Sequence, residues 1–143
     1  IDVSLPSLDN DLFNKISINL EALRKSCWKY IGVSRSKNTM QNFLHSINKT
    51  NQLLDDNPLL NLTKELETNQ RIYLNEPNRR AINLLIDLQN REITTRLLLE
   101  ACIFRQESRG GHFRADYPNK DQNWACHSFQ IKDKQIQKIS IRN

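Results

Sequence analysis

The sequence predicts a mainly α-helical fold: a three- to four-helix bundle with one long spine helix, followed by a short C-terminal β-hairpin. Its 143 residues include only three glycines and four prolines, too few for the many tight corners of a β-sandwich or barrel. Apolar residues recur at intervals of three and four through most of the chain, which is the period of an α-helix. After Pro118 the interval becomes two, which is typical of strands.

Two helices are predicted in the first part of the chain, over residues about 11–31 and 36–54. Asp9 or Asn10 is placed to cap the first helix, and Gly32 follows its last turn, where a left-handed residue commonly ends a helix. Ser34 or Ser36 is placed to cap the second. The apolar residues that define the two patterns are Leu12, Ile16, Leu20, Leu23, Cys27 and Tyr30, and then Met40, Phe43, Leu44 and Ile47.

A third helix is predicted over residues 59–75 from a weaker pattern, and a fourth over residues 77–108 from the strongest pattern in the chain. Pro77 fits the first turn of this fourth helix, where its missing N–H is not needed. We expect the fourth helix to be the spine of the domain and Gly110 and Gly111 to end it. Its predicted apolar face consists of Ile82, Leu85, Ile86, Ile93, Leu97, Ala101 and Phe104.

The rest of the chain is predicted to be a loop over residues 109–123 and a hairpin over about 124–141. The segments "WACHSFQI" and "QIQKISI" alternate in twos around the polar centre "KDK". An isolated hairpin is marginal in water, so we expect this one to lie on the helices or on another domain. Residues 1–143 are interpreted as one domain. Because the chain begins with Ile1 and a loose "IDVSLPSLDN", it is also interpreted as a fragment of a longer protein.

Composition argues against several classes of function. Cys27, Cys102 and Cys126 are odd in number and widely spaced, so neither a disulfide framework nor a metal site is expected. No apolar run approaches the roughly 18 residues of a membrane span, and a cytoplasmic protein without a membrane partner is predicted. The net charge is +5, but basic and acidic residues are interleaved and no stacking motif accompanies them, so no nucleic-acid partner is expected.

The candidate functional segment is "ESRGGHFRADYP", residues 107–118. Arg105 and Arg109 lie four apart at the end of the predicted spine helix, where cations suit the negative end of the helix dipole. One interpretation is that the arginines clamp a carboxylate or phosphate, with His112 as a donor or proton-transfer group. The interpretation favoured by the residues alone is a fixed polar joint, in which Glu107 and Asp116 neutralise the arginines.

The second half of this segment, "HFRAD", alternates like an extended chain. That spacing predicts His112, Arg114 and Asp116 on one polar side, with Phe113 and Ala115 on a side that can be buried. The other candidates for chemistry are weaker: Cys126 and His127 are strand neighbours that point to opposite faces, and Ser108 has no partnered base in a recognisable order. No catalytic residue is therefore assigned.

Two motifs make the chain resemble a known family. The stretch "RQESRGGHFRADYPNKDQNW" resembles a motif near the C-terminus of the succinate dehydrogenase, fumarate reductase and L-aspartate oxidase flavoproteins, where S-R-G, a small or apolar residue, H and then D-[FY]-P follow a long helix. The earlier stretch "LRKSCWKYIGVSRSKNTMQNFLHSI" is similar to a tryptophan, G-[IV]-x-R and amphipathic helix in the same C-terminal domain. Trp28, Gly32, Val33 and Arg35 resemble the L-aspartate oxidase branch, whereas "NKDQNWACHS" with its hairpin is also similar to the other branch.

The resemblance to the L-aspartate oxidase branch implies what the parent protein does. It would be an FAD-dependent oxidase that converts L-aspartate to iminoaspartate, with oxygen or fumarate as electron acceptor, in bacterial NAD synthesis. In that family the FAD-binding and capping domains precede this region, and none of their motifs occurs here. The fragment is therefore expected to bind no cofactor and to dock onto those domains.

The expected docking motif consists of Arg105, Ser108, Arg109, Gly110, His112, Arg114, Asp116 and Pro118. Gly111 departs from the alanine or leucine frequent in the family. Two alternatives remain open at this point. One is the corresponding domain of a succinate dehydrogenase or fumarate reductase flavoprotein, and the other is a free-standing helical interaction module.

Overall fold

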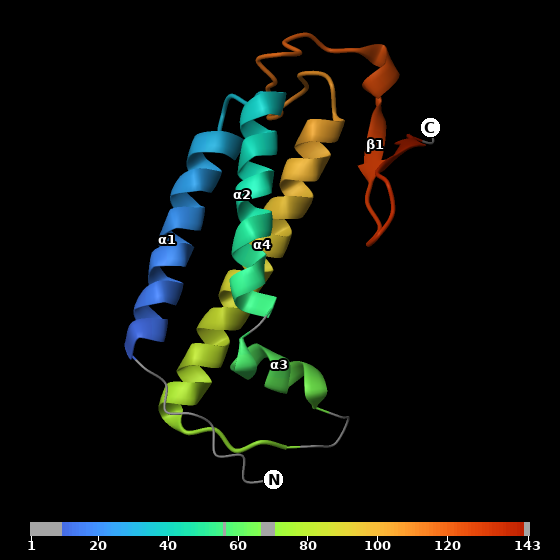
Figure 1. Cartoon of the computed structure of the whole chain (residues 1–143). Helices are drawn as coiled ribbons and strands as arrows, with labels where there is room; N and C mark the ends of the chain where they lie inside the picture. Colours follow the sequence, from blue (N-terminus) through green and yellow to red (C-terminus); the bar gives the residue numbers. More distant parts are fainter. Residues whose placement is uncertain (1–9, 56, 67–70, 142–143) are drawn as a thin grey trace.

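The computed structural model of the protein describes residues 10–55, 57–66 and 71–141. Three long helices stand side by side (Figure 1), with α1 and α4 running in the same direction and α2 running against them. The helices are α1 (Asn10–Ile31), α2 (Lys37–Asp55), the short α3 (Pro58–Glu65) and α4 (Glu76–Phe104). A single 3₁₀ turn, η1 (Gln122–Trp124), leads into strands β1 (Cys126–Phe129) and β2 (Gln137–Ser140). The predicted helical bundle with a long spine and a C-terminal hairpin is confirmed.

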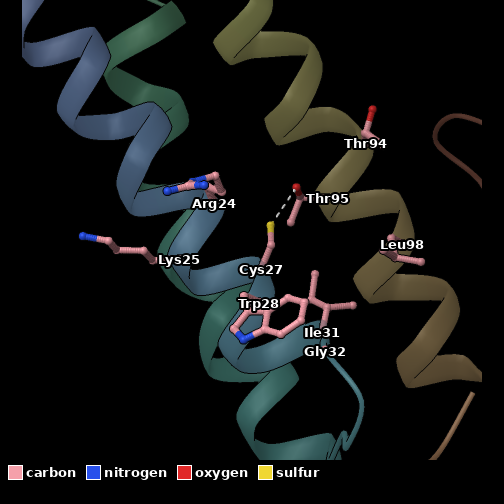
Figure 2. A pocket seen from close by; sticks show the side chains of 9 residues that line it. All are labelled: Arg24, Lys25, Cys27, Trp28, Ile31, Gly32, Thr94, Thr95 and Leu98. Atoms are coloured by element: carbon pink, nitrogen blue, oxygen red, sulfur yellow. Dashed lines mark hydrogen bonds between the residues drawn. The ribbon is translucent and has the colours of Figure 1, made fainter.

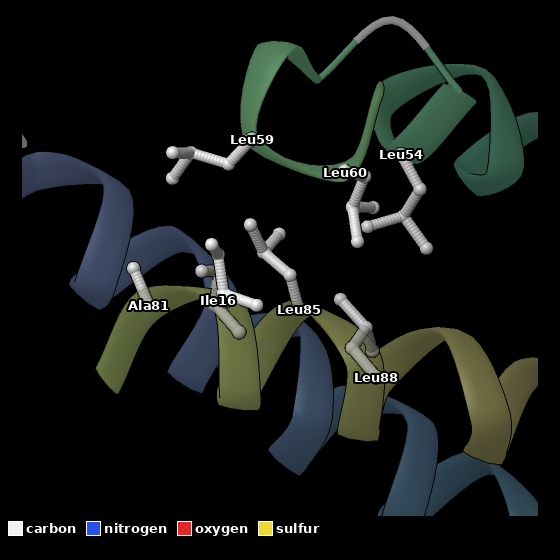
Figure 3. Packing of buried hydrophobic residues seen from close by; sticks show 8 residues of the cluster. Ile16, Leu54, Leu59, Leu60, Ala81, Leu85 and Leu88 are labelled. Carbon is white, nitrogen blue, oxygen red and sulfur yellow. The ribbon is translucent and has the colours of Figure 1, made fainter. Parts of the chain in front are cut away.

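Two clusters of apolar side chains hold the bundle together. The first lies where α3 crosses the lower end of the bundle (Figure 3), and the second lies toward the upper end, where α1 ends and α2 begins. The first cluster consists of Ile16, Leu54, Leu59, Leu60, Ala81, Ile82, Leu85 and Leu88. The second consists of Ile31, Met40, Phe43, Ile47, Leu99 and Cys102. Burial of these side chains is the main force that keeps the three long helices in contact.

The third predicted helix is shorter than residues 59–75, because it ends at Glu65 and residues 71–75 have no regular structure. Residues 67–70 of the predicted helix lie outside the described part. Leu66 already has extended backbone angles. Asn75 is also extended, and its side-chain oxygen accepts a hydrogen bond from the backbone N–H of Asn78 at 2.9 Å. This capping interaction fixes a helix start at Glu76, so a helix could not run continuously through Asn75.

The long helix α4 differs from its prediction in its end and in its buried face. It ends at Phe104 and not at residue 108, four residues nearer its N-terminus than predicted. Ile93 and Leu97, which were predicted to be buried, are 40% and 43% exposed. The inward face carries these residues instead: Leu88, Glu92, Thr95, Leu99 and Cys102. Apolar side chains occur on more than one side of α4, because the bundle packs on one side and the hairpin lies beside another.

Gly32 does follow the last turn of α1, but for a different reason from the one predicted. Its backbone is not in the left-handed region, since Gly110 is the positive-φ glycine of the described chain. A Cβ atom at Gly32 would collide with the carbonyl oxygen of Trp28. Glycine is therefore needed at this position because the backbone makes a close approach there.

The hairpin pairs β1 with β2 in an antiparallel register that runs from Cys126 opposite Ser140 to Phe129 opposite Gln137. It is attached to α4 at its start, where the rings of Phe104 and Trp124 meet edge to face with centroids 5.2 Å apart. Burial alternates along β1, whereas all of β2 is exposed. In the described ranges, no helix has the length and apolar character needed to cross a bilayer.

Candidate functional site

The candidate site is the stretch of residues 105–121, called here the polar loop, which connects α4 to the hairpin. It crosses the upper end of the bundle, where α1 and α4 end and α2 begins (Figure 1). Charged side chains in and against this loop are partly or fully buried, among them Arg35, Arg105, Glu107, Arg109 and Arg114. Most of the motif residues singled out in the sequence are therefore brought together at one end of the bundle.

Glu107 is the centre of the first part of the loop, and its side chain is completely buried. One oxygen accepts hydrogen bonds from Arg105 at 2.5 Å and from Nε of Arg109 at 2.7 Å. The other accepts from Arg109 at 3.1 Å and from the backbone N–H of Asp121 at 2.9 Å. The hydrogen bonds from Arg109, followed by those from Asp121 and Arg105, outweigh burial and lower the pKa of Glu107 to about 2. The carboxylate is charged and fully paired at neutral pH.

The two arginines beside Glu107 also bond to backbone carbonyls. Arg105 donates to the carbonyls of Trp124 at 2.9 Å and Cys126 at 2.6 Å, which joins the loop to the start of the hairpin. Arg109 donates to the carbonyl of Asp121 at 3.2 Å. This part of the loop is a polar joint between α4 and the hairpin, as the residues alone favoured.

Ser108 folds the loop back on itself. Its hydroxyl donates to the carbonyl of Tyr117 at 2.8 Å and accepts from the backbone N–H of Arg114 at 2.8 Å. Its own backbone N–H donates to the carbonyl of Asn119 at 3.0 Å. Because Ser108 is buried and its hydroxyl is used on both sides, its role in the described chain is structural.

Arg114 is completely buried and binds the end of α4. One terminal nitrogen donates to three carbonyl oxygens, those of Cys102 at 2.7 Å, Ile103 at 3.2 Å and Arg105 at 2.9 Å. The last carbonyls of a helix have no partner within the helix and carry its negative dipole end. The buried guanidinium therefore supplies the cap of α4, which explains why this helix ends before the two glycines.

Asp116 connects the same arginine to a different helix. Its carboxylate accepts two hydrogen bonds of 2.7 Å from Arg114 and a third, of 3.0 Å, from the backbone N–H of Lys37, the first residue of α2. The hydrogen bonds from Arg114, together with the one from Lys37, lower the pKa of Asp116 to about 2. An anion is thereby placed at the positive end of α2.

Arg35 brings the second motif of the sequence into contact with the first. Its backbone N–H donates to Phe113 at 3.2 Å and its carbonyl accepts from Ala115 at 2.8 Å, so that "GVSR" and "HFRAD" form a short parallel bridge. Its side chain donates to the carbonyls of Ile31 at 2.9 Å and Gly111 at 3.3 Å. Arg35 belongs to the second motif, and no local pattern in the sequence predicts that it touches the polar loop.

His112 lies half-buried between two arginines. Its Nδ1 is 3.2 Å from a terminal nitrogen of Arg35 and its Nε2 is 3.5 Å from the carbonyl oxygen of Arg105. Burial first, and then the positive charges of Arg35, Arg114 and Arg105, lower its pKa. We therefore assign a neutral ring in which Nδ1 accepts from Arg35 and Nε2 carries the proton.

The glycine pair forms a tight turn between Arg109 and His112, whose backbone groups bond to each other at 2.8 and 3.0 Å. Gly110 has a φ of +57°, which side-chain-bearing residues rarely adopt. Gly111 has open space where a Cβ would stand. Pro118 is exposed, directly after Tyr117.

The prediction that Phe113 and Ala115 form the buried side of "HFRAD" is wrong. Arg114 is fully buried, whereas Phe113 is 43% exposed and Ala115 is also exposed. The buried positive charge of Arg114 is stable because its guanidinium bonds to one carboxylate and three carbonyl oxygens. The arginine clamp for an external anion is not supported, since Glu107 and Asp116 already occupy the guanidinium groups.

The fold and the joined motifs define an α-helical bundle domain with a polar loop and a hairpin at its C-terminal end. The family model described as "Fumarate reductase flavoprotein C-term" matches residues 20–143, so the chain belongs to this flavoprotein family. Relatives include the L-aspartate oxidase of a Nostoc species, 28% identical over 83% of this chain and 21% of the relative. Another is the L-aspartate oxidase of Yersinia pestis, 30% identical over 76% of this chain and 17% of the relative.

A solved structure, Mycobacterium smegmatis Sdh1 in complex with UQ1, has the same fold, with a TM-score of 0.58 and 21% identity over 88% of this chain and 20% of that chain. The chain thus spans about a fifth of the length of the relatives it matches.

Proposed function

We propose that the chain is the C-terminal domain of an FAD-dependent L-aspartate oxidase that acts in the cytoplasm in NAD biosynthesis. The observation that supports this most is the contact between the two motifs through Arg35, which joins them at one end of the bundle. Relatives from several bacteria that are named L-aspartate oxidase favour this branch.

The domain's role in this proposal is structural. The pyrophosphate of FAD requires glycines at a turn from a strand into a helix. Here Gly32 lies between two helices, and Gly110 and Gly111 form a turn within the polar loop. These residues do not fit the flavin nucleotide, so the FAD and the L-aspartate would be bound by the preceding FAD-binding and capping domains of the parent chain.

The polar loop is the proposed docking motif, but its parts have different tasks. The side chains of Ser108, Arg114 and Asp116 hold the loop in shape through bonds within the domain. The large apolar side chains that the loop exposes are Phe113, at 43% exposed, and Tyr117, at 37% exposed. These two aromatic side chains would make the contact with the flavin-carrying body.

The test is an assay of the full-length protein with two substrates. Production of hydrogen peroxide with L-aspartate is expected, and dye reduction with succinate is not. A protein that reduces dye with succinate and leaves L-aspartate unchanged would instead be a succinate or fumarate flavoprotein. That second candidate is favoured by the description of the matching family model, which names fumarate reductase.

A further inference from the structure

A groove between α1 and α4 has no occupant within the described chain. Its volume is about 640 Å³, and a neighbouring hollow of about 360 Å³ shares several of its lining residues. Figure 2 shows Cys27, Trp28 and Ile31 of α1 on one side, with Thr95 and Leu98 of α4 on the other. These five residues are called here the α1/α4 groove.

Trp28 is the feature of this groove that the domain alone does not explain. Its side chain is 82% exposed, as is that of Val33 in the following turn, and Leu98 is 48% exposed. Trp28 belongs to neither of the two core clusters. An exposed tryptophan beside an apolar hollow is the kind of residue that dominates the centre of a protein–protein contact.

The backbone that follows Trp28 is held in place. Gly32 leaves room for the Trp28 carbonyl oxygen, which a larger residue would displace. Arg35 donates to the carbonyl of Ile31 and is itself bridged to the polar loop. A backbone that is already fixed loses less conformational freedom when a partner covers its side chains, which favours binding.

The charged side chains of the groove, Arg24 and Lys25, lie at its rim and surround an apolar centre. At the rim, Arg24 is paired with Glu21 at 2.9 Å and Lys25 lies 3.5 Å from the same carboxylate. On the floor, Cys27 Sγ and Thr95 Oγ1 contact each other at 3.4 Å. A polar rim around an apolar centre is the usual anatomy of an interface.

We infer that the α1/α4 groove, with Trp28 and Val33, binds an apolar segment of the flavin-carrying body of the same polypeptide. About four-fifths of the length of the relatives lies outside this chain, so the parent has ample chain to cover the groove. The groove is also continuous with the proposed docking loop, because Arg35, two residues after Val33, is bonded to Phe113. This inference rests on the proposed function and adds a second, separate contact surface.

The test is thiol labelling of the full-length protein with maleimide, read at each site by mass spectrometry. Trp28→Cys, made together with Cys27→Ser to remove the adjacent thiol, and Val33→Cys report on the groove. Tyr73→Cys is the control, since Tyr73 is 90% exposed and precedes α4 at the other end of the bundle. Each native rate is compared with the rate of the same variant in urea.

Labelling of Trp28→Cys and Val33→Cys is expected to be slowed by about tenfold or more in the native protein, as for sites inside a packed interface. The Tyr73→Cys control is expected to label close to its rate in urea. Groove positions that label as fast as in urea would overturn the inference. Protection that disappears on dilution would also overturn it, because the occupant would then be a second copy.

Failure of this inference can be told apart from failure of the proposed function, because labelling requires no substrate. A full-length protein that oxidises L-aspartate but labels freely at the groove would refute the contact alone. A protein that is protected at the groove but oxidises no L-aspartate would refute the enzyme assignment and leave the contact standing.

Discussion

Arg114 and Asp116 form a bidentate ion pair. Its positive charge lies at the end of α4 and its negative charge lies at the start of α2. The guanidinium bonds to two carbonyls in the last turn of α4, and the carboxylate accepts the first backbone N–H of α2. Both hydrogen bonds within the pair are 2.7 Å long. A single pair therefore complements the dipoles of two helices and fixes the loop between them.

Replacing Arg114 by alanine is expected to lower the free energy of unfolding by about 3 kcal/mol or more, because a partly buried carboxylate and three carbonyls lose their partner. Urea unfolding measures this change. The matched control is Arg91→Ala, which removes an exposed pair with Asp87 on α4 and should cost less than about 0.5 kcal/mol. Equal costs for the two variants would refute the capping role of Arg114.

Stability should depend on pH in the acid range through Glu107 and Asp116. Their pKa values in the folded protein, about 2, lie below the ordinary values of 4.5 and 3.8. The contribution of the charged forms is therefore complete above about pH 4.5 and is lost as the pH falls toward 2. Glu107→Gln should flatten this part of a plot of urea midpoint against pH, and a curve parallel to that of the wild type would contradict the assignment.

The three glycines should respond differently to alanine. Gly32→Ala forces a collision with the Trp28 carbonyl and is expected to be the most destabilising. Gly110→Ala should cost about 1 kcal/mol, since its φ is +57°. Gly111→Ala, with open space around it, should be neutral or stabilise by up to about 1 kcal/mol. Thermal unfolding of the three variants gives the order directly, and a neutral Gly32→Ala would contradict the close approach.

Arg109→Ala in the full-length protein is expected to lower stability or FAD retention more than it changes the affinity for L-aspartate. The reason is that Arg109 is bonded to Glu107 and to the carbonyl of Asp121. FAD release on heating and KM for L-aspartate are the two measurements. A higher KM with unchanged stability would make Arg109 a substrate-binding residue.

The sequence alone was sufficient to predict the helices and the hairpin, because their periods are local properties of the chain. The early end of α4 was not predictable in this way, since it depends on Arg114 reaching back to Cys102 and Ile103. Hydrophobic periodicity also misplaced the inner face of α4. Ile93 and Leu97 are as apolar as core residues, but they line a hollow between α4 and the hairpin and stay 40% and 43% exposed.

The candidate site was predicted in its residues but not in its geometry. The opposed charges of "ESRGGHFRADYP" favoured a polar joint, and the joint is present around Glu107. Alternation alone assigned Arg114 to the outside, because charged residues are rarely buried without partners. The partners come from α4, Asp116 and the start of α2, whose proximity no short segment of sequence encodes.

The most direct measurement is a titration of the isolated 143-residue chain with FAD, followed by fluorescence, beside the same measurement on the full-length protein. We expect that the full-length protein holds FAD, which L-aspartate reduces, and that the isolated chain binds none. Stoichiometric binding of FAD by the isolated chain, or turnover of L-aspartate by it, would contradict the assignment of this domain to a structural role.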